Sequence, residues 1–255
     1  MEIYLIIIII IFSFVCSYID CAFGMGYGTL MSPILLIFGY PISVIVPILL
    51  LSQMCTGFVA CIFHHRLKNA NFSIKERDTH TALVFAIFGS VATIIAVFLV
   101  ISVAQLYLTF YIGFSIVAIG IFLILKKRFT FSKSRLVMIG GISAFNKAIS
   151  GGGFGPIVTS GQMISGSDPK TAIAITSFAE TILSALGFML YLIFTTSFDF
   201  ELAILVIFSG VFAIPFGTIH AKRLNKEKGK LAIGLIILCL GSITLIQAIL
   251  SANVK

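Results

Sequence analysis

The sequence predicts an all-α polytopic membrane protein, because of its composition and the length of its apolar runs. Hydrophobic residues make up 59% of the 255 residues and charged residues only 10%, with a mean hydropathy of +1.16, whereas an average soluble domain is about 25% charged. Several runs reach the roughly 20 apolar residues that a helix needs to cross a bilayer. They are apolar on every face, and the strands of a membrane barrel would instead alternate. The composition therefore excludes an ordinary soluble domain and favours helical spans.

The basic residues gather in short segments between the apolar runs. Four Lys or Arg residues lie in 64–80, five in 126–135 and five in 222–230, and Lys170 marks a fourth basic place. Short loops rich in Lys and Arg stay in the cytoplasm. The formal net charge of +8 therefore indicates topology, with these four places inside, and does not indicate binding to nucleic acid.

Six full spans follow once the basic loops are placed inside. They are 43–63, 81–101, 104–125, 171–194, 201–221 and 231–250. Asp199 and Glu201 then fall outside. Two apolar segments, 5–38 and 136–165, must each begin and end on one side of the membrane. Each is therefore predicted to be a hairpin that enters the membrane and returns.

The two predicted hairpins carry similar sequences. "GMGYGTLMSPILLIFGYP" (24–41) aligns with "GGGFGPIVTSGQMISGSDP" (151–169), and the glycines match at an offset of 127 residues. The first motif ends outside and the second ends inside. The chain is therefore predicted to be an inverted repeat of two halves, 1–128 and 129–255, each a glycine-tipped membrane hairpin plus three transmembrane helices. Transporters built this way bind substrate near the bilayer midplane, at the repeat interface.

The glycine turns are candidate anion sites. Backbone that turns at membrane depth must be buried in protein or line a wet cavity, and glycine allows positive φ and close approach of a ligand. The helix that follows each turn adds free N–H groups and the positive end of its dipole. The alternative is that the glycines only let helices pack closely, as small residues do in membranes.

Three charged residues remain inside the predicted hydrocarbon region: Asp20, Lys147 and Glu180. Each costs about 2.5–3.5 kcal/mol at the centre of an inserted helix, so each is expected to face the protein interior or a cavity. Asp20 and Lys147 lie 127 residues apart, at equivalent repeat positions. They are expected to lie near each other and could form an ion pair. That pair would serve either a substrate or proton site, or only the architecture of the hairpins.

Glu180 lies near the middle of the span 171–194, and Gln53 is its approximate repeat equivalent. A carboxylate at this depth could carry a proton across the membrane. Equally, it could stay protonated and hydrogen-bonded to a neighbouring helix. The sequence leaves both interpretations open.

The five cysteines predict neither a metal site nor a redox site. All lie inside apolar segments, without a C-x-x-C pair and without histidine at metal-ligand spacing, so they are interpreted as small core residues. Cys21 beside Asp20 is the only candidate nucleophile for an intramembrane enzyme, and no histidine lies close in sequence to activate it. A scaffold without transport would not explain the three buried charges.

The sequence also resembles the TauE/SafE family of sulfite exporters over essentially its whole length. The resemblance rests on the paired motifs "GMGYGTLMSPILLIFGYP" and "GGGFGPIVTSGQMISGSDPKTAIAITSF", on "HHRLKNANF", and on "FGTIHAKRLNKEKGKLAIGLIILCLG". It implies a polytopic secondary transporter of small sulfur-containing anions such as sulfite or sulfonates.

Together, the residues and the resemblance predict an anion transporter in the cytoplasmic membrane of a prokaryote. We expect it to export its substrate by coupling to protons or the membrane potential, and to need no cofactor. An importer or channel for another small anion or sulfur compound is the alternative. The expected partners are the anion, the lipid bilayer and protons. The candidate substrate contacts are Gly24, Gly26, Gly28, Thr29, Ser32, Lys147, Ser150, Gly151, Gly152, Gly153, Gly155, Thr159 and Ser160, and the candidate coupling or structural residues are Asp20, Gln53 and Glu180.

Overall fold

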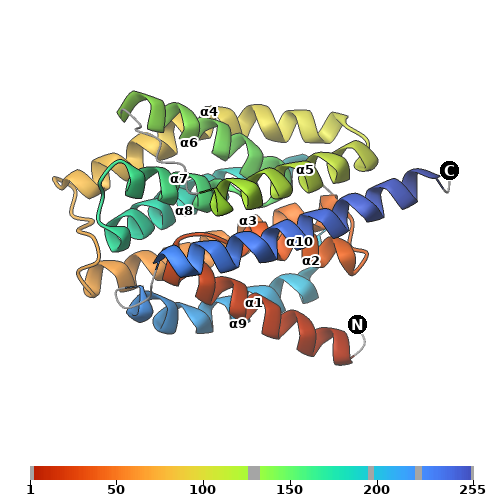
Figure 1. Ribbon diagram of the computed structural model, residues 1–255, viewed down its shortest axis with the longest axis horizontal. Helices are drawn as coiled ribbons and strands as arrows, with labels where there is room; N and C mark the ends of the chain where they lie inside the picture. Colours follow the sequence, from red (N-terminus) through yellow and green to blue (C-terminus); the bar gives the residue numbers. More distant parts are fainter. Residues whose placement is uncertain (1–2, 126–132, 195–197, 222–225, 254–255) are drawn as a thin grey trace.

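The computed structural model describes residues 3–125, 133–194, 198–221 and 226–253, and within them the chain forms ten helices and no strand (Figure 1). Seven helices are long and apolar enough to cross a membrane. These are α1 (Ile3–Phe23), α3 (Ile42–Arg66), α4 (Arg77–Ser102), α5 (Gln105–Ile124), α8 (Pro169–Phe194), α9 (Phe200–His220) and α10 (Lys226–Asn253). The predicted all-α polytopic class is confirmed, and the six predicted spans correspond to α3, α4, α5, α8, α9 and α10 with ends shifted by a few residues.

The two segments expected to be hairpins are each a long helix followed by a short one. The first is α1 and α2 (Tyr27–Ile37), and the second is α6 (Lys133–Ser150) and α7 (Phe154–Ile164). The short helices have 11 residues each, about 16 Å of rise, which is half the thickness of a hydrocarbon core. By contrast, α1 alone has 21 residues and is long enough to cross. The first arm is therefore longer than a hairpin that only dips into the membrane would need.

Glycine and proline end the short helices and start the next ones. Gly39 and Gly166 follow α2 and α7 with φ of +86° and +92°, a conformation that glycine adopts without a Cβ penalty. Pro41 and Pro169 then stand at the beginnings of α3 and α8, where a missing N–H costs nothing. The two chain segments therefore stop and restart by the same local chemistry.

Loops with basic residues lie at one end of the molecule, and other loops lie at the opposite end. Thr171, at the start of α8, donates to the carbonyl of Asn69 at 2.9 Å, so the basic segment after α3 lies against the loop before α8. At the opposite end, Tyr40 lines a groove together with Gln105 and Ser251, and both chain termini lie at this end (Figure 1). The basic segments 126–132 and 222–225 lie outside the described residues.

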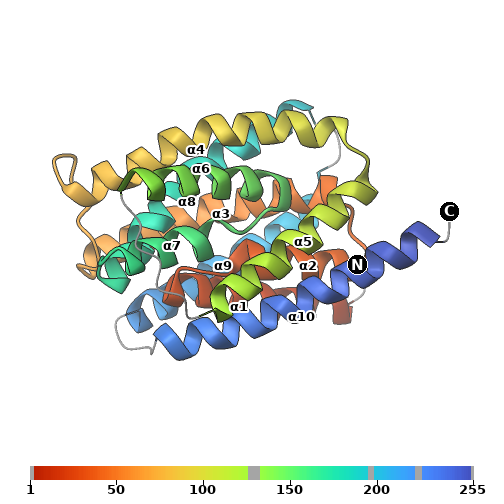
Figure 2. The same ribbon diagram turned by 45° about the horizontal axis from the view of Figure 1, so that its top comes forward.

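The main helix contacts join early helices to late ones. α1 packs on α9, α4 on α6, α3 on α8, and α5 on α10. Figure 2 shows α3 and α8 in the middle of the bundle, with α4 on one side and α1 on the other. Since α3 and α8 also have the most buried span windows, polar groups on these two helices face protein, where their cost can be offset.

The α5–α10 contact depends on small residues. A Cβ added at Gly120 would lie 2.9 Å from the backbone N of Leu238, and one added at Gly241 would lie 2.9 Å from that of Val117. These distances are too short for real side chains, so glycine is needed for the helices to approach this closely. Packing of this kind replaces the hydrophobic driving force that lipid does not supply.

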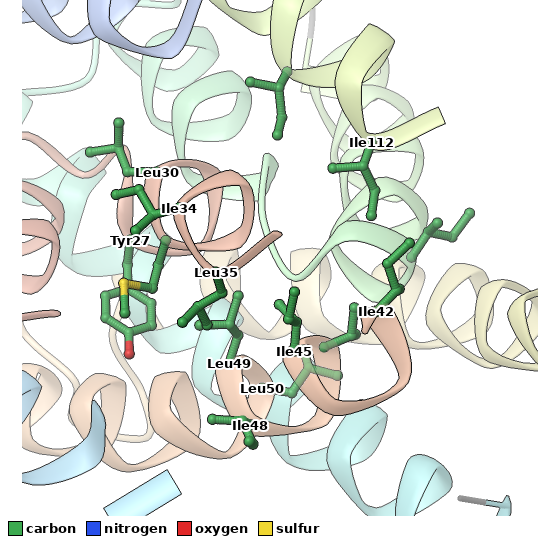
Figure 3. Close-up of a cluster of buried hydrophobic side chains, with 14 of the residues drawn as sticks. Tyr27, Leu30, Ile34, Leu35, Ile42, Ile45, Ile48, Leu49, Leu50 and Ile112 are labelled. Atoms are coloured by element: carbon green, nitrogen blue, oxygen red, sulfur yellow. The ribbon is translucent and has the colours of Figure 1, made fainter. Parts of the chain in front are cut away.

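The short helix α2 is held by an apolar cluster that it forms with α3 and α5. Leu30 and Leu35 of α2, Ile45 of α3 and Ile112 of α5 are buried members of this cluster (Figure 3). Tyr27, the first residue of α2, points its hydroxyl out of the cluster and shares a hydrogen bond of 2.6 Å with Ser52 of α3. The turn that precedes α2 is therefore fixed against α3.

The charge distribution of the loops makes a test of topology possible. In a background without native cysteines, a cysteine at Asn71 should react with a membrane-impermeant maleimide only from the cytoplasmic side. A cysteine at Gln105 should react only from outside, because the single helix α4 separates the two positions. Both side chains are exposed in the protein. Labelling of both from one side would contradict the assigned topology.

Candidate functional site

Both chain breaks rest on glycines in left-handed backbone conformations. Gly24 and Gly26 have φ of +70° and +143°, and Gly151 and Gly153 have φ of +76° and +95°. Residues with a Cβ rarely adopt these angles. Glycine therefore ends α1 and α6 and lets the chain start a new helix within three residues.

The two turns contact each other backbone to backbone. A Cβ placed on Gly28 would overlap the carbonyl of Gly151, and one placed on Gly152 would overlap the backbone N of Thr29. Neither Gly28 nor Gly152 has a positive φ, so these two glycines are needed for space and not for conformation. The turns predicted from distant parts of the sequence thus meet inside the protein.

Hydrogen bonds close the contact between the turns. The backbone N–H of Gly153 donates to the Oγ1 of Thr29 at 2.9 Å, and the hydroxyl of Thr159 donates to the carbonyl of Gly24 at 2.8 Å. Gly155 approaches the same carbonyl closely, since its Cβ would lie 2.9 Å from the Gly24 oxygen. The predicted site residues of both turns are therefore together in one buried cluster.

Some donors of the proposed anion cradle already have partners within the protein. The N–H of Gly152 donates to the Oγ of Ser150 at 3.2 Å. In the first turn, the N–H of Tyr27 faces the Oδ1 of Asp20 at 3.5 Å, so a carboxylate of the chain itself stands at the N-terminus of α2, where the helix dipole favours negative charge. An external anion would have to displace Ser150 and Asp20 to reach these donors, and only the N–H of Gly153, bonded to Thr29, would be freed if the turns parted.

Lys147 is buried, with 1% of its surface exposed. Its Nζ donates to the side-chain carbonyl of Gln53, and it forms an ion pair with the Oε1 of Glu180 at 3.4 Å. The sequence allowed an ion pair with Asp20, but the ion pair that Lys147 forms among the described residues is with Glu180. The helix α6, which carries Lys147, contacts α3 and α8, the helices that carry Gln53 and Glu180.

Asp20, Gln53 and Glu180 line a small cavity between α1, α3, α8 and α9. Its polar lining is Ser17, Asp20, Gln53, Thr56, Ser177 and Glu180. The cavity volume is about 10 Å³, room for about one water molecule. A sulfur oxyanion is larger than that, so this cavity in its present form does not hold one.

Ser32 and Ser160 were also predicted as oxyanion contacts. They lie on α2 and α7, both are buried, and neither hydroxyl has a hydrogen-bond partner within the described part of the chain. Each hairpin therefore carries one buried hydroxyl that makes no hydrogen bond with the described residues in this conformation.

Four residues that build the site were not among the predicted site residues, although Ser177 is close to Glu180 in the sequence. Asn146 donates to the carbonyl of Gly152 at 3.1 Å and supports the second turn. Ser17, Thr56 and Ser177 line the cavity. Each of these three stands three residues from Asp20, Gln53 or Glu180, and residues three apart share a helix face. Helical spacing from the buried charges would therefore have found them.

The fold combines long apolar helices, two chain breaks that meet inside the bundle, and buried charges. These are the features of a polytopic membrane transporter. A comparison of the sequence with protein-family models identifies the family. The chain belongs to the Sulfite exporter TauE/SafE family, whose family model matches residues 9–244. The comparisons with curated proteins and with solved structures gave no match.

The contact between the turns predicts a strong effect of one methyl group. Gly152→Ala should lower the thermal unfolding midpoint of the detergent-purified protein by about 5 °C or more, because the Cβ would overlap the backbone of the first turn. Gly141→Ala is the control, since a Cβ at Gly141 in α6 meets no atom within 4 Å. Equal midpoints for the two variants would show that the turns are not in contact.

Proposed function

We propose that this protein is a secondary transporter that exports small sulfur-containing oxyanions, such as sulfite or sulfonates, across the cytoplasmic membrane of a prokaryote. Membership of the family of sulfite exporters supports the substrate class. The substrate site lies where the two glycine turns meet, next to Lys147. Protons or the membrane potential drive the export, and no cofactor takes part.

The proposal treats the chain as an inverted repeat with halves 1–128 and 129–255. Its support is that the helix contacts are reciprocal. If α1 to α5 correspond to α6 to α10, the contact of α1 with α9 is the counterpart of that between α6 and α4, and the α3–α8 and α5–α10 contacts are their own counterparts. A two-fold relation of this kind would let the bundle open alternately towards either side of the membrane.

The observation that carries the proposal is the buried side chain of Lys147 on the helix that ends at the second turn. The carbonyl of Lys147 accepts the N–H of Gly151 at 2.8 Å, so the lysine lies one helical turn before the chain break. A buried cation and glycine N–H groups together can bind an oxyanion once the turns have parted. An anion entering between the turns would compete with Glu180 for the ammonium.

In this conformation the proposed anion site is closed. The turns contact each other through their backbones, and Lys147 is already paired with Glu180. Substrate binding therefore requires the turns to separate and the Lys147–Glu180 pair to loosen. A transporter must pass through such a closed state whenever neither side has access to the site.

Variants of the Lys147–Glu180 pair should distinguish a role in stability from a role in transport. Lys147→Met alone leaves a buried carboxylate without its partner, and should lower the free energy of unfolding by about 3–5 kcal/mol. Lys147→Met with Glu180→Gln removes both charges and should recover most of the folded yield. The double variant should nevertheless fail to transport, because the cation that binds the substrate is gone.

Folded yield is measured by size-exclusion chromatography and transport by sulfite efflux from proteoliposomes. Lys170→Met is a matched control, because Lys170 pairs with Asp168 at 3.5 Å at the protein surface and surface pairs contribute little. Normal sulfite efflux by the double variant would exclude Lys147 from the substrate site.

The substrate class is tested by counterflow with purified protein. Proteoliposomes preloaded with sulfite should take up labelled sulfite, and unlabelled thiosulfate, sulfoacetate, sulfate and taurine should be compared as competitors. We expect the small sulfur oxyanions to compete and zwitterionic taurine to compete least, since its ammonium would face Lys147. Absence of labelled sulfite uptake, together with no competition by any of the other sulfur compounds, would contradict the proposed function.

A further inference from the structure

The small cavity between α1, α3, α8 and α9 has the wrong charge for an anion. Two carboxylates, Asp20 and Glu180, belong to its lining, and none of the described residues that line it is a cation. Lys147 offsets Glu180 from outside the lining. Asp20 has no ion pair among those the described residues form. With both carboxylates ionised, the group of Asp20, Glu180 and Lys147 therefore carries one negative charge beyond neutrality.

The hydroxyl groups around this cavity present oxygen lone pairs. The hydroxyls of Thr56 and Ser177 donate to the backbone carbonyls of Ser52 and Ile173 at 2.8 and 3.0 Å, so their hydrogens are engaged and their lone pairs remain. Ser17, 1% exposed, has a buried Oγ without any hydrogen-bond partner among the described residues. Leaving a buried hydroxyl unpaired costs free energy, which a bound ion would recover.

We propose that this cavity binds one small monovalent cation of the size of sodium, and that the bound ion regulates the neighbouring anion site. Its lining offers hard oxygen donors, which suit an alkali cation. No cluster of three or more His, Cys, Asp or Glu residues suited to a metal occurs in the described ranges, so a transition metal is not the occupant. The single excess charge is neutralised by one monovalent ion.

The position of Asp20 explains how such an ion would act on the anion site. Asp20 lies in the last turn of α1, where the helix dipole is negative and favours a cation. The same carboxylate faces the N–H of Tyr27 in the first glycine turn at 3.5 Å. A cation bound to Asp20 would draw the carboxylate away from that N–H. It would thereby free a donor of the turn for the anion. This effect on the anion site rests on the proposed function, whereas binding of the ion does not.

The test is ion-specific thermal stabilisation of the purified protein without any anion substrate, at fixed pH and ionic strength. Replacing 150 mM choline chloride by sodium chloride should raise the unfolding midpoint by about 3 °C or more, and potassium chloride should not. Ser17→Ala should weaken the apparent sodium affinity at least ten-fold without lowering the midpoint in choline, because its hydroxyl makes no hydrogen bond. Asp20→Asn should abolish the shift.

Ser184→Ala is the matched control. Ser184 in α8 is also fully buried with an unpaired hydroxyl, but it does not belong to the cavity lining, so the variant should keep the sodium shift. An equal shift in potassium or choline, a stabilisation that follows pH and not sodium, or a Ser17→Ala variant with unchanged sodium affinity would each overturn the proposal. Because no sulfur oxyanion is present and chloride is constant throughout, these outcomes do not depend on whether sulfite is carried.

Discussion

The contact between two glycine turns is the constraint on which the rest of the site depends. Gly28 and Gly152 bring two stretches of backbone together where any side chain would overlap the opposite chain. The short helices α2 and α7 begin at this contact, and α1 and α6 end there. The charged residues in the last turns of α1 and α6 are thereby fixed beside the contact. Both turns are buried, which is the condition under which irregular backbone is tolerated inside a membrane.

The electrostatics of the centre follow from the difference between the two turns. The carbonyls of Asp20 and Lys147 accept the N–H of the first glycine of their turns, Gly24 and Gly151, yet one side chain is an anion and the other a cation. The carboxylate can stand at the N-terminus of its own following helix, and it does so at Tyr27. An ammonium cannot, because the N–H groups there are donors. Lys147 instead reaches the oxygens of Gln53 and Glu180.

The same asymmetry separates two binding environments that lie next to each other. We propose an anion site at the second turn with Lys147, and a cation site in the cavity that carboxylates and hydroxyls line. Glu180 belongs to both, since it pairs with Lys147 and lines the cavity. If both proposed sites bind their ions, occupation of one would alter the free energy of the other through Glu180.

The sequence by itself determined the spans, the chain breaks and the identity of the buried charges. Apolar length predicts helices that cross a bilayer, glycine clusters predict where the chain turns, and the cost of burying Asp20, Lys147 and Glu180 predicts that they face the interior. Only the tertiary structure decided that Lys147 pairs with Glu180 and that Ser17 lines a cavity. The physical reason is that a similarity between two stretches of sequence indicates which positions correspond, but it does not say which side chains touch. In addition, a helix that faces lipid is apolar all round, so its sequence does not mark which side meets a neighbouring helix.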